Sequence, residues 1–216
     1  MNFSALQASP LFAKISADDI EKLCRCLHCQ TAHASAGQHL WNAGDPVTSA
    51  ALVMRGRIRA ELIGETGVRR IAAIHREGGL IGDILMTEGR KSPVDIIAET
   101  DCELLLIPFE GILSGCSAAC GCHSVLRQNL MQEIARKYWQ QRARIACLEA
   151  PTLRQKILLF LHQHADEAGS RIFRLEFDRE GMADYLCVNR SALCRELSAM
   201  KQDGLIDYYK ESFKLL

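Results

Sequence analysis

The sequence predicts an α+β protein in three parts: a strand-rich N-terminal part, one long helix, and a C-terminal part of short helices that ends in a β-hairpin. Between residues 33 and 109, short apolar runs alternate with glycine-containing turns, which indicates β-strands. Between residues 123 and 148, apolar residues recur mostly at spacings of three, four or seven, which indicates a helix. Residues 177–216 show two short helical patterns followed by an alternating tail.

Composition limits the class of protein. The chain has 216 residues, 48% hydrophobic and 24% charged, as in an ordinary globular protein of one large or two small domains. Its formal net charge is zero, so any basic surface must be local. No apolar run reaches the length of a membrane span, and the first residues lack the pattern of a signal peptide. We therefore expect a cytoplasmic protein with no membrane partner, whose 10 cysteines are reduced thiols, metal ligands or redox groups.

No arrangement of residues indicates catalytic chemistry. The sequence contains no serine–histidine–acid constellation, no GxxxxGK[ST] phosphate loop and no pair of acids that requires an enzyme. We therefore predict that the protein is not an enzyme.

The N-terminal part should begin with a short helix and continue as strands. Ser16, with Asp19 three residues later, forms a capping box in outline, and Ile20, Leu23 and Leu27 have the spacing of an amphipathic helix. The strand candidates are the apolar runs 51–54, 71–74, 96–98 and 104–107. Short strands separated by turn glycines predict a β-sandwich or jelly roll.

The long helix carries a narrow apolar stripe surrounded by charged residues. The stripe consists of Leu126, Leu130, Ile134, Tyr138, Ile145 and Leu148. A narrow stripe on a long helix requires a partner, which can be the strand-rich part or the same helix of a second copy. Pro151 ends this pattern, and Thr152 can cap the helix that follows.

Two short helices with a tight turn between them are predicted near the C-terminus. Their apolar positions are Met182, Leu186, Val188, Leu193, Leu197 and Met200. Asn189 is a suitable N-cap for the second helix, and Gly204 a suitable residue to end it. The alternating tail at residues 205–216 predicts a hairpin, so the whole pattern is that of a winged helix-turn-helix.

The face of the second helix opposite its apolar stripe carries Arg190, Ser191, Cys194 and Arg195. A helix that is buried on one side and bears arginines on the other fits a DNA major groove, where one guanidinium can bond two acceptors of guanine. A surface helix with solvated charges is the alternative reading.

These stretches resemble one known family. The sequence DYLCVNRSALCREL at residues 184–197, followed by Gly204-Leu205-Ile206, is similar to the DNA-binding signature of the Crp/Fnr transcription regulators. The order of Gly37, Trp41, Gly44-Asp45, LVMRG at 52–56, Gly79 and Gly82-Asp83 is similar to the cyclic-nucleotide-binding β-roll of that family.

The resemblance implies a jelly-roll sensor domain at residues 1–115, a dimerisation helix at 116–149 and a winged helix-turn-helix at 150–216. It also implies a homodimer that binds double-stranded DNA at a twofold-symmetric site, responds to a small-molecule effector and could contact RNA polymerase.

The candidate DNA-binding residues are Asn189, Arg190, Ser191, Cys194, Arg195 and Lys201. Arg195 is the first candidate for a base contact, and Lys201 for a phosphate contact. Ser191 stands where many members of the family carry a base-reading glutamate, so the usual half-site of the family is not expected here. Oxidation of Cys194 could block DNA binding.

The candidate effector-pocket residues are Gly82, Asp83, Ile84, Arg90, Lys91 and Ser92. The resembled family holds the cyclic nucleotide with a Gly-Glu pair and a later Arg-Ser pair. Here Asp83 replaces the glutamate and Ser92-Pro93 stands in place of Arg-Ser, although Arg90 or Lys91 could substitute after a register shift. A buried phosphate needs a cation and oriented donors, so we expect an unknown effector other than cAMP, or a roll with no small ligand.

Two groups of cysteines stand out: Cys24, Cys26 and Cys29, and Cys116, Cys120 and Cys122. Closely spaced thiolates suit zinc or an iron–sulfur cluster. Fnr-type members hold such a cluster with three N-terminal cysteines and one from the roll, which by resemblance designates Cys102 as the fourth ligand, although the spacing of the first group departs from theirs. A thiol redox sensor and inert core thiols are the alternatives.

Overall fold

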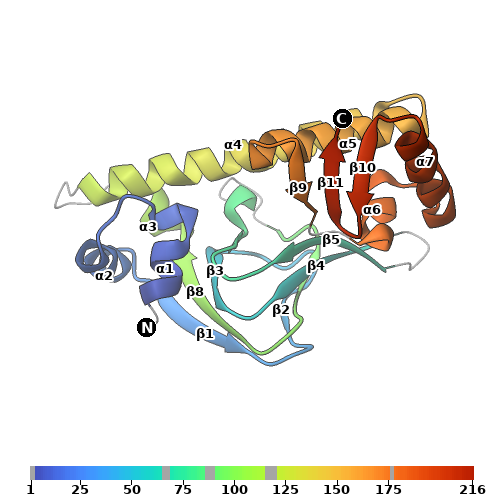
Figure 1. Ribbon diagram of the computed structural model, residues 1–216. Coiled ribbons are helices and arrows are strands. Elements are labelled where there is room, and N and C mark those ends of the chain that lie inside the picture. Colours follow the sequence, from blue (N-terminus) through green and yellow to red (C-terminus); the bar gives the residue numbers. More distant parts are fainter. Residues whose placement is uncertain (1–2, 65–68, 86–90, 115–120, 176–177) are drawn as a thin grey trace. The chain divides into compact units, whose positions relative to one another are not determined.

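The computed structural model describes residues 3–64, 69–85, 91–114, 121–175 and 178–216 (Figure 1). These residues form two compact units, Met1–Ala135 and Arg136–Leu216. The long helix α4 (Gly121–Glu149) contains the point of division.

The first unit combines helices with two antiparallel sheets. Its helical elements are α1 (Phe3–Ala8), η1 (Pro10–Phe12), α2 (Ala17–Cys26), η2 (Asp83–Leu85) and α3 (Phe109–Leu113). Its strands are β1 (Gln30–Ala34), β2 (His39–Trp41), β3 (Ser49–Arg55), β4 (Ile58–Ile63), β5 (Arg69–His75), β6 (Leu80–Ile81), β7 (Asp95–Ala98) and β8 (Cys102–Pro108).

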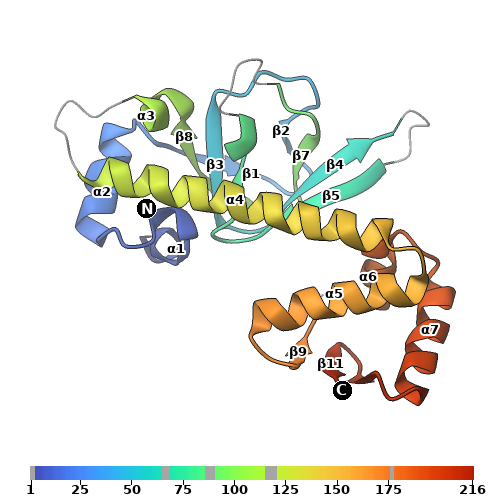
Figure 2. The same cartoon turned by 90° about the horizontal axis from the view of Figure 1, so that it is seen from above.

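The strands of this unit form the two four-stranded sheets of a jelly roll. The strand orders are β1-β8-β3-β6 and β2-β7-β4-β5, and each described pairing is antiparallel. Figure 2 shows β2 beside β7, and β4 beside β5, in the second sheet. One core lies between the sheets and includes Val53 and Leu104 from the first sheet and Ile58 and Ile96 from the second. Alternate residues of a strand face opposite sides, so one sheet can serve two cores.

The other face of the first sheet is covered by helices. Leu52 of β3 and Leu105 of β8 pack there with Leu27, which follows α2, and with Leu126 and Leu130 of α4. Both faces of β3 are therefore buried, which explains its almost uninterrupted apolar sequence.

The second unit has its own core and its own antiparallel sheet. It contains α5 (Leu153–Ala168), β9 (Ile172–Arg174), α6 (Arg179–Leu186), α7 (Arg190–Gln202), β10 (Ile206–Tyr209) and β11 (Ser212–Leu215). The sheet order is β10-β11-β9. The core includes Phe160 of α5, Leu186 of α6, Leu197 of α7 and Phe213 of β11, together with Cys147 near the end of α4.

The predicted α+β class and the winged helix-turn-helix are confirmed. Two helix starts also agree with the sequence, because the side chains of Ser16 and Thr152 accept backbone N–H groups as N-caps. Phe177, the first residue of the predicted DNA-binding stretch, lies outside the described residues.

Candidate nucleic-acid interface and sensor site

Helix α7 begins at a well-formed cap. The Asn189 side-chain oxygen accepts the N–H of Ser191 at 2.9 Å and that of Ala192 at 3.3 Å. Cys187, which ends α6, adopts the left-handed conformation with φ 53°, so the chain turns sharply between the two helices. An N-cap of this kind stabilises a helix by about 1 kcal/mol. The predicted role of Asn189 as a cap is confirmed.

The outer face of α7 presents unpaired positive charge. Leu193, Leu197 and Met200 are fully buried on the inner face. Arg190, Ser191 and Arg195 are exposed, and Cys194 is half-buried. Within the part of the chain that the structure describes, neither Arg190 nor Arg195 forms an ion pair, so both guanidinium groups are available to an external anion or base edge.

Two ion pairs that the sequence did not reveal hold α7 against α5. The Arg154 guanidinium donates to Glu196 Oε1 and to Asp203 Oδ2, both at 2.6 Å. The bonds to Glu196 and then Asp203 raise the pKa of Arg154. One side chain on α5 therefore contacts the helix α7 at two points and fixes its position relative to α5. No local pattern signals this link, because the partners lie 42 and 49 residues away.

The hairpin β10–β11 is attached to the helices by two cations. Lys201 Nζ lies 2.6 Å from Asp207 Oδ1 and donates to the carbonyl oxygen of Tyr208 at 3.3 Å. Arg179 of α6 donates to the carbonyl oxygen of Lys210 at 2.7 Å and stacks over the ring of Phe213. Lys201, predicted to contact phosphate, is thus already paired and could reach DNA only by weakening that pair.

The predicted effector-pocket residues have different environments. Asp83 and Ser92 are buried, whereas Ile84 and Lys91 are exposed and Arg90 lies outside the described residues. Ser92 Oγ donates to the carbonyl oxygen of Val94 at 2.6 Å, and its N–H donates to that of Asp45 at 2.9 Å. Both donors of Ser92 are therefore engaged inside the protein.

The backbone conformation and the surroundings of residue 82 favour glycine over any other residue. Its φ is +79°, and an added Cβ would lie 3.1 Å from the Trp41 ring. The Trp41 ring packs against the turn at Gly82 and is partly buried against the core between the sheets.

Both halves of the chain match known families. Residues 31–118 match the profile of the Cyclic nucleotide-binding domain, and residues 155–216 match that of the Crp-like helix-turn-helix domain. The chain belongs to the Crp/Fnr family. The Crp/Fnr protein is accordingly a transcription regulator with a DNA-binding helix-turn-helix, as its sequence predicted.

Individual relatives agree with this assignment. Electron transport regulator A of Shewanella oneidensis is 27% identical over 179 residues, which cover 79% of this chain and 68% of the relative. The Fumarate and nitrate reduction regulatory protein of Vibrio cholerae is 27% identical over 177 residues, with the same two coverages, 79% and 68%. These relatives are regulators and not enzymes, which confirms the expectation of no catalytic activity.

The fold has solved counterparts. The c-di-GMP-responsive global regulator CLP of Xanthomonas campestris superimposes with a TM-score of 0.61 at 18% identity, over 93% of this chain and 99% of that chain. At this identity the likeness concerns the fold alone. No helix among the described residues of the Crp/Fnr protein is long and apolar enough to cross a membrane.

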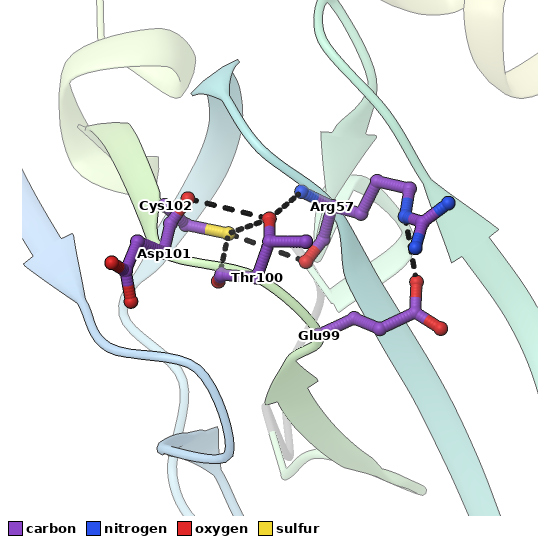
Figure 3. Close-up of polar contacts among 5 residues, drawn as sticks. All are labelled: Arg57, Glu99, Thr100, Asp101 and Cys102. Carbon is purple, nitrogen blue, oxygen red and sulfur yellow. Dashed lines mark hydrogen bonds and ion pairs between the residues drawn. The ribbon is translucent and has the colours of Figure 1, made fainter.

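Cys102 is not placed as a metal ligand in this Crp/Fnr protein. Its thiol lies within hydrogen-bond distance of two carbonyl oxygens, those of Arg57 at 3.2 Å and Thr100 at 3.1 Å (Figure 3). It also pairs with Ala34 at the far end of β1, whereas Cys29 precedes the near end. Five extended residues span about 16 Å, which is too far for one cluster.

The other three predicted ligands do not converge either. Cys24 is buried, Cys26 is exposed, and the two lie two positions apart on α2, on opposite sides of the helix. Among the described residues there is no group of three histidine, cysteine or acidic side chains placed to hold a metal ion. The expected four-cysteine cluster of Cys24, Cys26, Cys29 and Cys102 is therefore not assembled, and an iron–sulfur cluster does not fit these residues as they stand.

Cys24 and Cys29 nevertheless lie next to each other, since the N–H of Cys29 donates to the carbonyl oxygen of Cys24 at 2.9 Å. The interaction between their thiols lowers the pKa of Cys24 and raises that of Cys29. Of the second group, Cys116 and Cys120 lie outside the described residues, and Cys122 is half-buried at the start of α4.

Proposed function

We propose that this regulator is a homodimer that binds a twofold-symmetric duplex DNA site by placing the N-terminal half of α7 in the major groove. The observation that carries the proposal is the pair of exposed arginines, Arg190 and Arg195, which form no ion pair with any residue that the structure describes and lie on a helix whose other face is fully buried. A guanidinium in that position can bond O6 and N7 of guanine together. In a dimer the two α7 helices would enter the groove about one DNA turn, ~34 Å, apart.

The residues of this face would have different roles in DNA recognition. Arg195 would contact a base edge, and Arg190 and Ser191 would contact a base or a phosphate. Asn189 would orient the helix by capping it, with its oxygen engaged by two N–H groups. Lys201 would mainly position the hairpin through Asp207.

An exposed stripe on α4 supports the homodimer. Met131, Tyr138 and Ile145 follow one another at intervals of seven residues and are 71%, 57% and 41% exposed. A seven-residue repeat of apolar side chains is the seam of a two-helix coiled coil. We therefore assign residues 116–149 to dimerisation, 1–115 to sensing and 150–216 to DNA binding.

The β-roll would receive the controlling signal, and cAMP does not suit it. Ser92 has no donor left for a phosphate, because its hydroxyl and N–H are bonded to Val94 and Asp45. Asp83 is buried and is one methylene shorter than the glutamate that a ribose contact requires. We infer a small-molecule effector of another kind.

A redox signal is the second candidate. The relatives include an electron transport regulator and a fumarate and nitrate reduction regulatory protein, names that describe those proteins. In this chain Cys24 and Cys29 adjoin, whereas Cys26 and Cys102 lie apart from that pair, so a thiol reaction is favoured over a cluster. Oxygen-free purification followed by an absorption spectrum and metal analysis separates the two: broad absorption near 400 nm with iron and sulfide would favour the cluster.

Replacement of Arg195 tests base reading. Because Arg195→Ala removes a contact made only to the correct base, we expect it to weaken binding to the selected site by about 1–3 kcal/mol and to leave random DNA nearly unaffected. Fluorescence anisotropy with both DNAs at one salt concentration measures the two affinities. Arg171→Ala is the matched control. Arg171 is exposed in the same unit, and its carbonyl oxygen accepts the N–H of Leu215, at the end of β11 away from the hairpin turn. Equal losses on both DNAs would show that Arg195 contacts only the backbone.

A further inference from the structure

The end of α2 has the backbone geometry that brings two particular side chains together. The N–H of Cys29 donates to the carbonyl oxygen of Cys24 at 2.9 Å, and the N–H of His28 donates to that of Arg25 at 3.1 Å. His28 is left-handed, with φ 56°. This pair of bonds is a Schellman motif, in which the residues at the positions of Cys24 and Cys29 characteristically touch.

The side chains at those two positions are both thiols here. Cys24 is 5% exposed, and Cys29 is half-buried against the same core. Both side chains therefore belong to one apolar environment. Cys26, in the same turn, is exposed on the other side of the helix. The motif therefore selects one pair out of three neighbouring cysteines.

We propose that Cys24 and Cys29 form a reversible disulfide, a covalent oxidation site at the C-terminal end of α2. The backbone hydrogen bond already holds the two residues next to each other, so little movement is needed to bring their sulfur atoms to bonding distance. Neither thiol needs to leave the core that it occupies in the reduced protein.

The reaction balances with hydrogen peroxide as the oxidant. One thiol takes an oxygen atom from the peroxide and becomes a sulfenic acid, with release of one water molecule. The other thiol then attacks that sulfur, the S–O bond breaks, the S–S bond forms, and a second water molecule leaves. A small disulfide such as oxidised glutathione can replace the peroxide through two exchange steps, in which it is reduced to two thiols.

The site adjoins tightly packed structure. An added Cβ at Gly111 of α3 would lie 2.9 Å from the carbonyl oxygen of Leu27, so the backbone between the two cysteines has no free space on that side. This close approach restricts movement of the turn that carries Cys24 and Cys29. The inference is independent of the DNA-binding proposal, because it concerns only the first unit.

Peptide mapping tests the disulfide directly. The full-length protein is reduced without oxygen, treated with hydrogen peroxide or with oxidised glutathione, alkylated in denaturant and digested with trypsin. Cleavage after Lys22, Arg25 and Arg55 leaves Cys24 in peptide 23–25 and both Cys26 and Cys29 in peptide 26–55. We expect these two peptides to be joined, with Cys26 alkylated, and to separate after dithiothreitol.

Matched serine variants identify the pair. Cys26→Ser should leave the linkage unchanged, and Cys29→Ser should abolish it. Three results would overturn the inference. In the first, Cys24 and Cys29 are both alkylated although other thiols of the chain are oxidised. In the second, Cys24 is joined to Cys26; in the third, Cys24 or Cys29 is oxidised to the sulfinic acid and no disulfide forms. Any of these results would leave the DNA-binding proposal unaffected, since that rests on the anisotropy titration.

Discussion

At the scale of single residues, the cations of α7 differ in what they can bind. Arg190 and Arg195 have no ion pair within the described chain, whereas Lys201 lies 2.6 Å from Asp207. Free guanidinium groups can pair with phosphate or guanine without giving up a contact, and a paired lysine cannot. The same helix thus carries residues suited to DNA contact and one suited to holding the hairpin.

The pKa of Asp207 is lowered by its hydrogen bond from Lys201. Because the carboxyl pKa is lowered in the folded protein, the pair stabilises that state fully at pH values above the ordinary pKa of aspartate. This stabilisation is lost as the pH falls through the lowered pKa. At neutral pH the pair is therefore present, and the carboxylate of Asp207 offsets the positive charge of Lys201.

Removal of the Asp207 charge should release Lys201 for phosphate. For Asp207→Asn we expect tighter binding to random DNA and a salt dependence steeper by up to about 0.9 in log K against log salt per subunit. Anisotropy titrations over a range of salt concentrations measure the slope. Asp166→Asn, which removes an equal charge from the exposed side of α5, should change it little. An unchanged slope for Asp207→Asn would mean that Lys201 does not reach the DNA backbone.

At the scale of elements, the orientation of α7 depends on a side chain of another helix. Arg154 joins α5 to Glu196 and Asp203 across two bonds of 2.6 Å. A recognition helix must enter the groove at a defined angle, so loosening this link should affect specific binding before it affects folding.

Arg154→Met should therefore weaken specific DNA binding without any contact to DNA. We expect faster hydrogen exchange in α7 and a smaller ratio of specific to random affinity, because α7 is no longer held at its C-terminal half. Mass-spectrometric hydrogen exchange and anisotropy measure these quantities. Lys156→Met removes the same charge from the same helix and serves as the control. If α7 exchanges at the wild-type rate in Arg154→Met, the link does not position the helix.

The elements that could be predicted from sequence are those set by local rules. The caps Ser16, Thr152 and Asn189 act on N–H groups two or three residues away, so the pattern alone reveals them. Arg154 could not be found in this way, since its partners are brought close only by folding. The separation of Cys102 from the other three cysteines could not be predicted either, because it depends on the register of β1 against β8, which places Ala34 opposite Cys102.

At the scale of the whole molecule, an apolar stripe on α4 remains exposed in the single chain. The sequence predicted Tyr138 and Ile145 as part of the apolar stripe but not Met131, and it left open whether the β-roll or a second copy covers the stripe. Leu126 and Leu130 are buried in the first unit, whereas Met131, Tyr138 and Ile145 remain exposed. The exposed residues are the part available to a second subunit.

A charge within that stripe should separate the subunits. For the wild type we expect a dimer in analytical ultracentrifugation, and for Tyr138→Glu a dimer dissociation constant at least about tenfold higher, because a carboxylate in an apolar seam costs more than 1.4 kcal/mol. Gln140→Glu adds the same charge on the opposite side of the helix and should remain dimeric. A wild-type protein that stays monomeric at DNA-binding concentrations would refute the dimer.

Selection of duplex DNA from a random pool tests the central claim most directly. We predict an enriched sequence with two inverted half-sites whose centres lie one DNA turn, about 10 base pairs, apart. With Arg195→Ala, the same selection should lose preference at one position in each half-site. A pool that shows no enrichment, or a single unrepeated motif, would contradict a symmetric dimer that reads bases through α7.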